Sequence, residues 1–174
     1  FSGKIVSDLT GTHSGDAPVA SAESPPAAGS LESLLPGLEA KVAANPKDAD
    51  ARLLLAQTYG ELGRRGDALR VFTKLVTESP NDGRVRFMQA ELLMRGDSPA
   101  ELRAAFDALG ASIKIYPAAS YLARLHQGEI KLRLGDKPTA LRIWREQLQR
   151  LAPDDQHRSL FERAIANASA TTGS

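Results

Sequence analysis

Two stretches of this chain, which begin 72 residues apart at positions 61 and 133, read alike. The first runs Glu-Leu-Gly-Arg-Arg-Gly-Asp-Ala-Leu-Arg-Val-Phe-Thr-Lys-Leu-Val and the second Arg-Leu-Gly-Asp-Lys-Pro-Thr-Ala-Leu-Arg-Ile-Trp-Arg-Glu-Gln-Leu. That offset equals two units of about 36 residues, a period typical of stacked helical hairpins that bury their apolar faces against one another. The sequence therefore predicts an all-α solenoid rather than a compact enzyme fold.

Composition excludes several function classes. The 22 basic and 21 acidic residues leave a net charge of +1, so no basic field is available to hold a nucleic acid backbone. The absence of cysteine excludes disulfides and thiolate sites for metals or catalysis. No apolar run approaches the length of a membrane-spanning helix. The sequence predicts no enzyme, no cofactor and no metal site.

The chain divides into three parts. Residues 1–30 are rich in Pro, Ala, Ser and Gly and read as a flexible tail or linker, in which the apolar piece 4–9 is either a docking peptide or a remnant. Residues 31–168 carry helical periodicity, and 169–174 read as a frayed end. The first residue is Phe and not Met, which predicts a processed chain or a fragment with a signal or anchor upstream.

Caps and breakers predict where the helices begin and end. We expect Ser33 to cap the first helix, with Pro36 in its first turn, and Asp48 or Asp50 to cap the second. Gly63 ends the second helix and Asp67 opens the third. Further helices are expected at about 83–95, 99–115, 119–134, 137–151 and 155–168, the last of them a terminal cap that covers the apolar end of the stack.

The repeat resembles the tetratricopeptide repeat (TPR), because 34 residues separate Pro46 from Pro80. The middle unit, Pro80 to Pro117, is three residues longer. The resemblance implies a right-handed solenoid of about three hairpins with a preceding helix and a C-terminal capping helix; a generic helical array is the alternative. Its signature positions are Leu55, Ala56, Tyr59, Gly63, Ala68, Phe72 and Leu75 in the first unit, and Gly128, Leu134, Gly135, Ala140, Trp144 and Pro153 in the last.

A narrower resemblance, over roughly 31–168, is to the periplasmic TPR domain of the cytochrome c maturation family CcmI, also called CycH. The sequence segments 38–50, 53–63 and 147–155 carry this resemblance. The resemblance implies a non-catalytic assembly factor that binds the C-terminal helix of an apocytochrome c. It also implies the bacterial periplasm, with membrane association through an anchor outside this chain or through a partner.

The first helices of TPR hairpins line a concave groove, which suits an amphipathic helix or an extended peptide. We expect Phe87, Met94 and Leu125 to anchor the ligand; the alternative is that Phe87 and Leu125 belong to the core. Leu53 and Gln57 stand where chaperone-binding TPR domains have Lys and Asn, so that subclass is not expected. The expected groove residues are Leu53, Gln57, Glu61, Arg84, Phe87, Glu91, Met94, Leu122, Leu125, Glu129 and Arg133.

A second function remains open at this stage. The chain is alternatively an accessory or scaffold subunit of a larger bacterial membrane or respiratory complex, with its N-terminal tail docked on a partner. His126 and Glu129, three residues apart on one helix, are too few for a metal site and are interpreted as a solvated or groove-facing pair.

Overall fold

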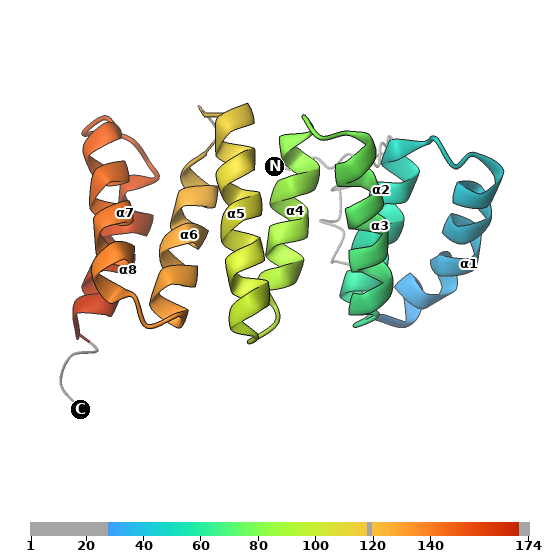
Figure 1. Ribbon diagram of the computed structural model, residues 1–174, viewed down its shortest axis with the longest axis horizontal. Helices are drawn as coiled ribbons and strands as arrows, with labels where there is room; N and C mark the ends of the chain where they lie inside the picture. Colours follow the sequence, from blue (N-terminus) through green and yellow to red (C-terminus); the bar gives the residue numbers. More distant parts are fainter. Residues whose placement is uncertain (1–27, 118–119, 171–174) are drawn as a thin grey trace, which may run out of the picture.

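The computed structural model describes residues 28–117 and 120–170, and this part of the chain is entirely helical, without strands (Figure 1). The predicted 1–30 tail, apart from its last three residues, and the last four residues of the predicted frayed end lie outside it. The helices are α1 (Ala28–Ala44), α2 (Ala49–Glu61), α3 (Arg65–Glu78), α4 (Gly83–Met94), α5 (Pro99–Ile115), α6 (Tyr121–Arg133), α7 (Lys137–Arg150) and α8 (Arg158–Ala170).

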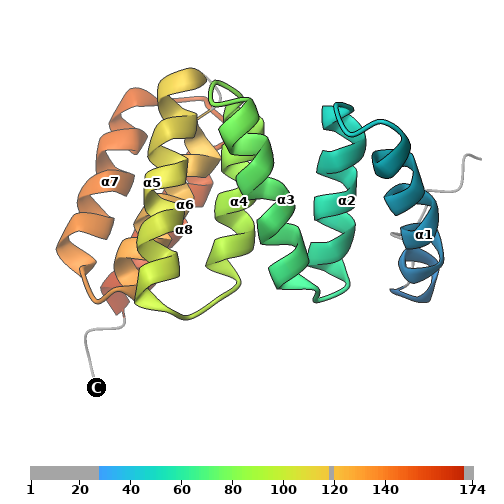
Figure 2. The same cartoon turned by 45° about the vertical axis from the view of Figure 1, so that its right-hand side comes forward.

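The helices form a single row of hairpins, α2/α3, α4/α5 and α6/α7, with α1 before them and α8 after them (Figures 1 and 2). Each helix packs chiefly on the helices next to it in the chain, and α8 also reaches α6. An arrangement in which each unit touches only its neighbours is a solenoid. The predicted fold class, three hairpins with a preceding helix and a terminal cap, is confirmed.

Short local contacts start and stop these helices. The carboxylate of Asp48 accepts from the Ala51 amide at 2.9 Å, so Asp48 rather than Asp50 caps α2. Asp82 and Asp136 cap α4 and α7 in the same way. Gly63 and Gly135 follow the first helices of two hairpins with φ of 73° and 79°, a conformation that other residues rarely adopt, and the predicted stop at Gly63 is confirmed.

Three predicted helix starts are wrong. α1 begins at Ala28, upstream of Ser33, and runs through Pro36. Leu35, the residue before Pro36, is buried in the first core cluster. This packing offsets the loss of the backbone hydrogen bond that proline cannot make. α3 begins at Arg65, and Asp67 lies in its first turn, where it accepts from Arg64 Nε at 2.7 Å. α8 begins at Arg158, and turns at 153–154 and 156–157 precede it.

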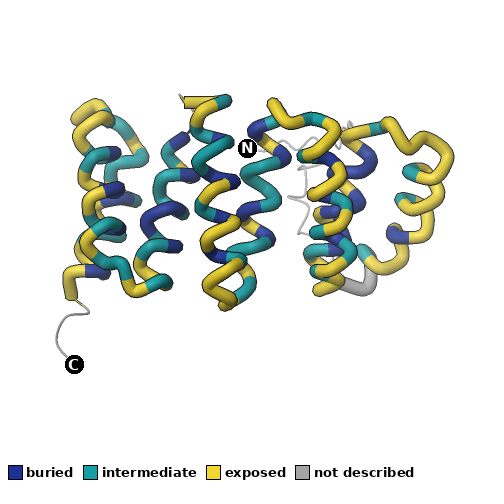
Figure 3. Tube along the Cα trace, in the orientation of Figure 1, coloured by how far each residue is buried: buried dark blue, intermediate teal, exposed yellow. Residues whose placement is uncertain are grey.

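The core of the described residues consists of three clusters: the first joins α1, α2, α3 and residues of α4, the second joins α4, α5 and α6, and the third joins α6, α7 and α8. Fully buried alanines, among them Ala56, Ala90 and Ala140, let paired helices approach closely. Phe72 fills space between α2 and α4, and Trp144 fills space between α6, α7 and α8. The small and aromatic positions of the repeat therefore lie where the pattern predicts. Figure 3 shows buried residues recurring along the hairpins, whereas α1 is largely exposed. None of the described helices has the length and apolarity needed to span a membrane.

Candidate functional site

One side of α2, α4 and α6 carries exposed and half-buried residues in matching rows, and we call it the first-helix face. Small buried residues at matching positions, Ala56, Ala90 and Gly128, set the register of the three helices. Counting from them places equivalent residues in rows that run from helix to helix. The face comprises Asp50, Leu54, Gln57 and Glu61 of α2, Arg84, Met88, Glu91 and Arg95 of α4, and Leu122, His126, Glu129 and Arg133 of α6.

Arginines of α4 bind carboxylates of α2 across this face. Arg84 Nη2 donates to Asp50 Oδ1 at 3.0 Å near the helix N-termini. At the other end, Arg95 pairs with Glu61 and donates to the carbonyl oxygen of Gly60 at 3.0 Å. Both ion pairs are exposed, so each contributes little to stability, and both link α2 to α4 across the face.

α6 is tied to α4 in the same manner. Arg133 donates to the carbonyl oxygens of Met94 and Gly96, each at 2.6 Å, and to the carboxylate of Asp97 at 2.8 Å. The guanidinium of Arg133 therefore supplies hydrogen-bond donors to two backbone carbonyl groups at the C-terminal end of α4. Since the charges of the face are largely paired within the protein, a ligand gains little by charge alone, and apolar contacts become the main source of affinity.

His126 lies at the middle of the face and joins the two helices. Its ring contacts that of Phe87 with centroids 5.8 Å apart, and its Nδ1 is 2.8 Å from Glu129 Oε2. Glu91 of α4 lies 3.9 Å from Nε2. The hydrogen bond to Glu129 and the two negative charges raise the pKa of His126 above its ordinary 6.5, against the opposing effect of burial. Among the described residues no group of three side chains suited to a metal ion is found.

Replacing Glu129 with glutamine is expected to lower the pKa of His126. A group whose pKa is raised by folding stabilises the fold fully below its unfolded value and loses that contribution as pH rises through the folded value. The native chain should therefore exceed Glu129→Gln in stability by the widest margin below pH 6.5, and the margin should shrink above it. A titration of the His126 ring protons by NMR, with urea unfolding below and above that pH, checks both statements. An unchanged His126 pKa in the variant would contradict the assignment.

Two hollows flank α4 on the first-helix face. One, of about 200 Å³, lies where the first turns of α4 and α6 meet the end of α5, and it is lined by Phe87, Leu122, Tyr116 and Arg84, among others. The other, of about 150 Å³, lies between α2 and α4 and has Met88 and Phe72 among its lining residues, together with several polar side chains of the face. Each has the size of a single side chain, so the pair suits two apolar residues of one peptide.

The structure places the expected groove residues in two groups. Gln57, Glu61, Arg84, Glu91, Leu122, Glu129 and Arg133 lie on the first-helix face, and Phe87 lines one of its hollows. Leu53 is only 5% exposed and packs in the first core cluster, so its predicted place in the groove is wrong. Met94 and Leu125 are half-buried against the second and third clusters, and so is Phe87 against the second.

The expected groove list lacked five residues of the face: Asp50, Leu54, Met88, Arg95 and His126. Successive residues point about 100° apart around a helix, so the exposed position beside Leu53 is Leu54, which is 50% exposed. The signal was present, because aligning Ala56 with Ala90 and Gly128 makes Leu54, Met88 and His126 equivalent. Of the expected anchors, Phe87 and Leu125 lie with Leu53 in the adjacent row, whose residues pack against the core clusters.

Comparison with known families fits this architecture. Residues 35–92 match the tetratricopeptide repeat family model. The match covers α2, α3, most of α1 and most of α4. No curated protein matches the chain.

Solved structures extend the likeness in fold to most of the chain. A crystal structure of MamA has a TM-score of 0.63 at 17% identity, over 82% of this chain and 84% of that one. A second MamA structure gives 0.66 at 17% identity, over 83% and 75%. TTC0263, a thermophilic TPR protein of Thermus thermophilus, gives 0.61 at 21% identity, over 83% and 76%. The fold is a TPR-like solenoid, and solenoids of this kind use their extended surfaces to bind proteins.

Proposed function

We propose that this protein is a non-catalytic interaction module that binds a helical or extended peptide on its first-helix face. The observation that supports this most directly is the pair of hollows on either side of α4. They lie on a face whose leucines are open to solvent, with Leu54 50% and Leu122 37% exposed. Apolar side chains at the centre of an interface supply most of its binding energy.

The ligand suited to this face is an amphipathic segment. Two of its apolar side chains enter the two hollows, so they must be far enough apart in the ligand to reach both sides of α4. Polar groups of the ligand contact Gln57 and the solvent-exposed atoms of the arginine–carboxylate ion pairs on the face. These contacts orient the ligand without strong electrostatic attraction. This description fits a helix with one apolar stripe better than a uniformly charged tail.

The finer proposal is an assembly factor of c-type cytochrome biogenesis in the bacterial periplasm, with the C-terminal helix of an apocytochrome c as ligand. It rests on the sequence resemblance to the CcmI family over roughly 31–168. Such a helix is amphipathic, as the face requires. Membrane association, in this proposal, comes from an anchor outside this chain or from a partner.

Isothermal calorimetry with a synthetic C-terminal helix of a c-type apocytochrome tests both levels. The native chain should bind saturably, and the double variant Leu54→Ala, Leu122→Ala should bind at least about tenfold more weakly, a loss of about 1.4 kcal/mol. Because both side chains are exposed, the variant should remain folded. Leu34→Ala, which removes an exposed leucine from α1, is the matched control and should bind as the native chain does.

The two levels fail differently. Absence of binding to the native chain would sink the apocytochrome proposal and favour the alternative, an accessory or scaffold subunit of a membrane or respiratory complex. Copurification with a redox complex would support that alternative. Binding that survives the double variant unchanged would instead move the binding site off the first-helix face.

A further inference from the structure

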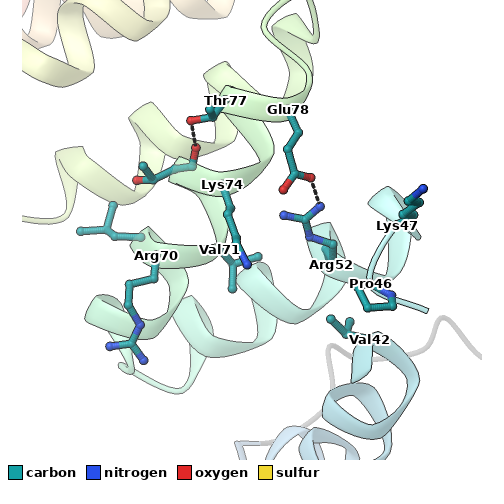
Figure 4. A pocket seen from close by; sticks show the side chains of 11 residues that line it. Val42, Pro46, Lys47, Arg52, Arg70, Val71, Lys74, Thr77 and Glu78 are labelled. Atoms are coloured by element: carbon teal, nitrogen blue, oxygen red, sulfur yellow. Dashed lines mark hydrogen bonds and ion pairs between the residues drawn. The ribbon is translucent and has the colours of Figure 1, made fainter. Parts of the chain in front are cut away.

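A groove of about 1100 Å³ lies between α1 and α3, with α2 behind it (Figure 4). It shares no lining residue with the first-helix face, and it is far larger than the two hollows there. Val42 of α1 faces Val71 of α3 across the opening, and Leu69 adds to the apolar lining. All three are half-buried and pack against the first core cluster.

The rim of this groove is basic. Four of its lining side chains are cationic, and Glu78 is the single anion. That anion is already bound to Arg52, which is 6% exposed. Lys47 and Lys74 stand on opposite sides of an apolar floor. The pKa of Glu78 is lowered chiefly by the hydrogen bond from Arg52, and the positive charge of Lys74 lowers it further. The chemistry that fits is a short apolar segment that carries a carboxylate.

The chain itself holds such a segment before α1. Within residues 1–27 the large aliphatic and aromatic side chains are concentrated at the start, at Phe1, Ile5, Val6 and Leu9. The stretch as a whole carries three carboxylates, Asp8, Asp16 and Glu23, against one lysine, Lys4, a net charge opposite to that of the groove rim. Within residues 4–9, Asp8 is the one anion that can pair with the rim lysines, and Lys4 lies at the other end of the segment.

The connection is long enough. Eighteen residues, 10–27, separate Leu9 from the start of α1. Extended, they span up to about 60 Å, whereas α1 is about 26 Å long. The segment therefore reaches any part of a groove that borders α1.

We propose that residues 4–9 dock in the α1–α3 groove of their own chain. Ile5, Val6 and Leu9 cover the apolar floor, and Asp8 pairs with the rim lysines. Tethering raises the local concentration of the segment into a range where modest contacts suffice for occupancy. Docking covers the face of α1 that the hairpins leave open, and it is independent of the peptide site on the first-helix face.

A spin label on Ser7→Cys in the full chain tests this, since the native chain has no other cysteine. The methyl NMR signals of Val42, Leu69 and Val71 should be lost while the label is paramagnetic and return when it is reduced. Signals of Leu54 and Leu122, on the first-helix face, should persist. A sample that mixes labelled chains with separate isotope-enriched chains should show no loss.

Matched variants separate the contributions. Ile5→Asp with Leu9→Asp should restore the groove signals, and Lys74→Glu should restore them in part, whereas Lys114→Glu on α5 should change nothing. Circular dichroism checks that each variant is folded. Persistence of the groove signals in the native sequence, or equal loss on both faces, would overturn the proposal. Loss of the groove signals in the mixed sample as well would assign the groove to a second copy and overturn it too.

Discussion

Replacing Trp144 with alanine is expected to lower the free energy of unfolding by about 3–5 kcal/mol, the usual cost of deleting a large buried aromatic side chain. Trp144 is 2% exposed and belongs to the third core cluster, where α7 meets α6 and α8. Its Nε1 also donates to the carbonyl oxygen of Leu125 at 3.0 Å. Truncation leaves a cavity and removes the hydrogen bond of the indole, and each loss is destabilising.

Urea unfolding followed by circular dichroism measures this change, because the variant has no tryptophan left to fluoresce. Trp144→Phe serves as the control: it keeps most of the apolar volume and loses only the indole N–H, so it should cost clearly less than alanine. A loss below about 1 kcal/mol for the alanine variant would show that the third cluster collapses around the gap, contrary to the tight packing described here.

Replacing Gly128 with alanine is expected to destabilise the protein by about 1–3 kcal/mol, although alanine is the better helix former. A Cβ at this position would overlap Nε1 and Cε2 of the Trp144 indole. The ring is fully packed and cannot move aside as an exposed side chain would. The close approach of α6 and α7 therefore requires glycine here.

Gly110→Ala on α5 is the matched control, since its Cβ would meet Gln127 Nε2 at an ordinary 3.6 Å. That change should be neutral or stabilise the helix by up to about 1 kcal/mol. The Trp144→Ala background offers a sharper check: with the indole gone, Gly128→Ala should lose most of its cost, and the two changes should be strongly non-additive. Additive effects would contradict a direct clash between these two positions.

Much of the fold could be predicted because helix starts, helix ends and helix packing depend on nearby residues in a solenoid. Gly63 and Asp48 mark a helix end and a helix start through their own backbone chemistry, and Ala56 or Phe72 recur wherever two helices meet. The start of α1 escaped prediction because Pro36 usually lies near a helix start. Here Pro36 lies inside the helix, and the burial of the neighbouring Leu35 stabilises the helix on both sides of the proline.

The candidate site was predicted less well, for a geometric reason. Whether Leu53 or Leu54 meets solvent depends on a rotation of about 100°, which is fixed by how α2 packs between α1 and α3. The contact of His126 with Phe87 and Glu91 joins two helices and leaves no mark in the local sequence. The α1–α3 groove likewise arises from the placement of a whole helix.

The division of the core also sets how the molecule responds to force. Within the described residues the second and third clusters share Phe106, and the first cluster takes in Val85 and Leu92 of α4, so apolar side chains join each hairpin to the next. Tension between the two ends would therefore detach helices from the ends of the stack, where a helix packs on fewer neighbours. The domain should lengthen in steps, and a partner held on α2 and α4 together would oppose the separation of the first two hairpins.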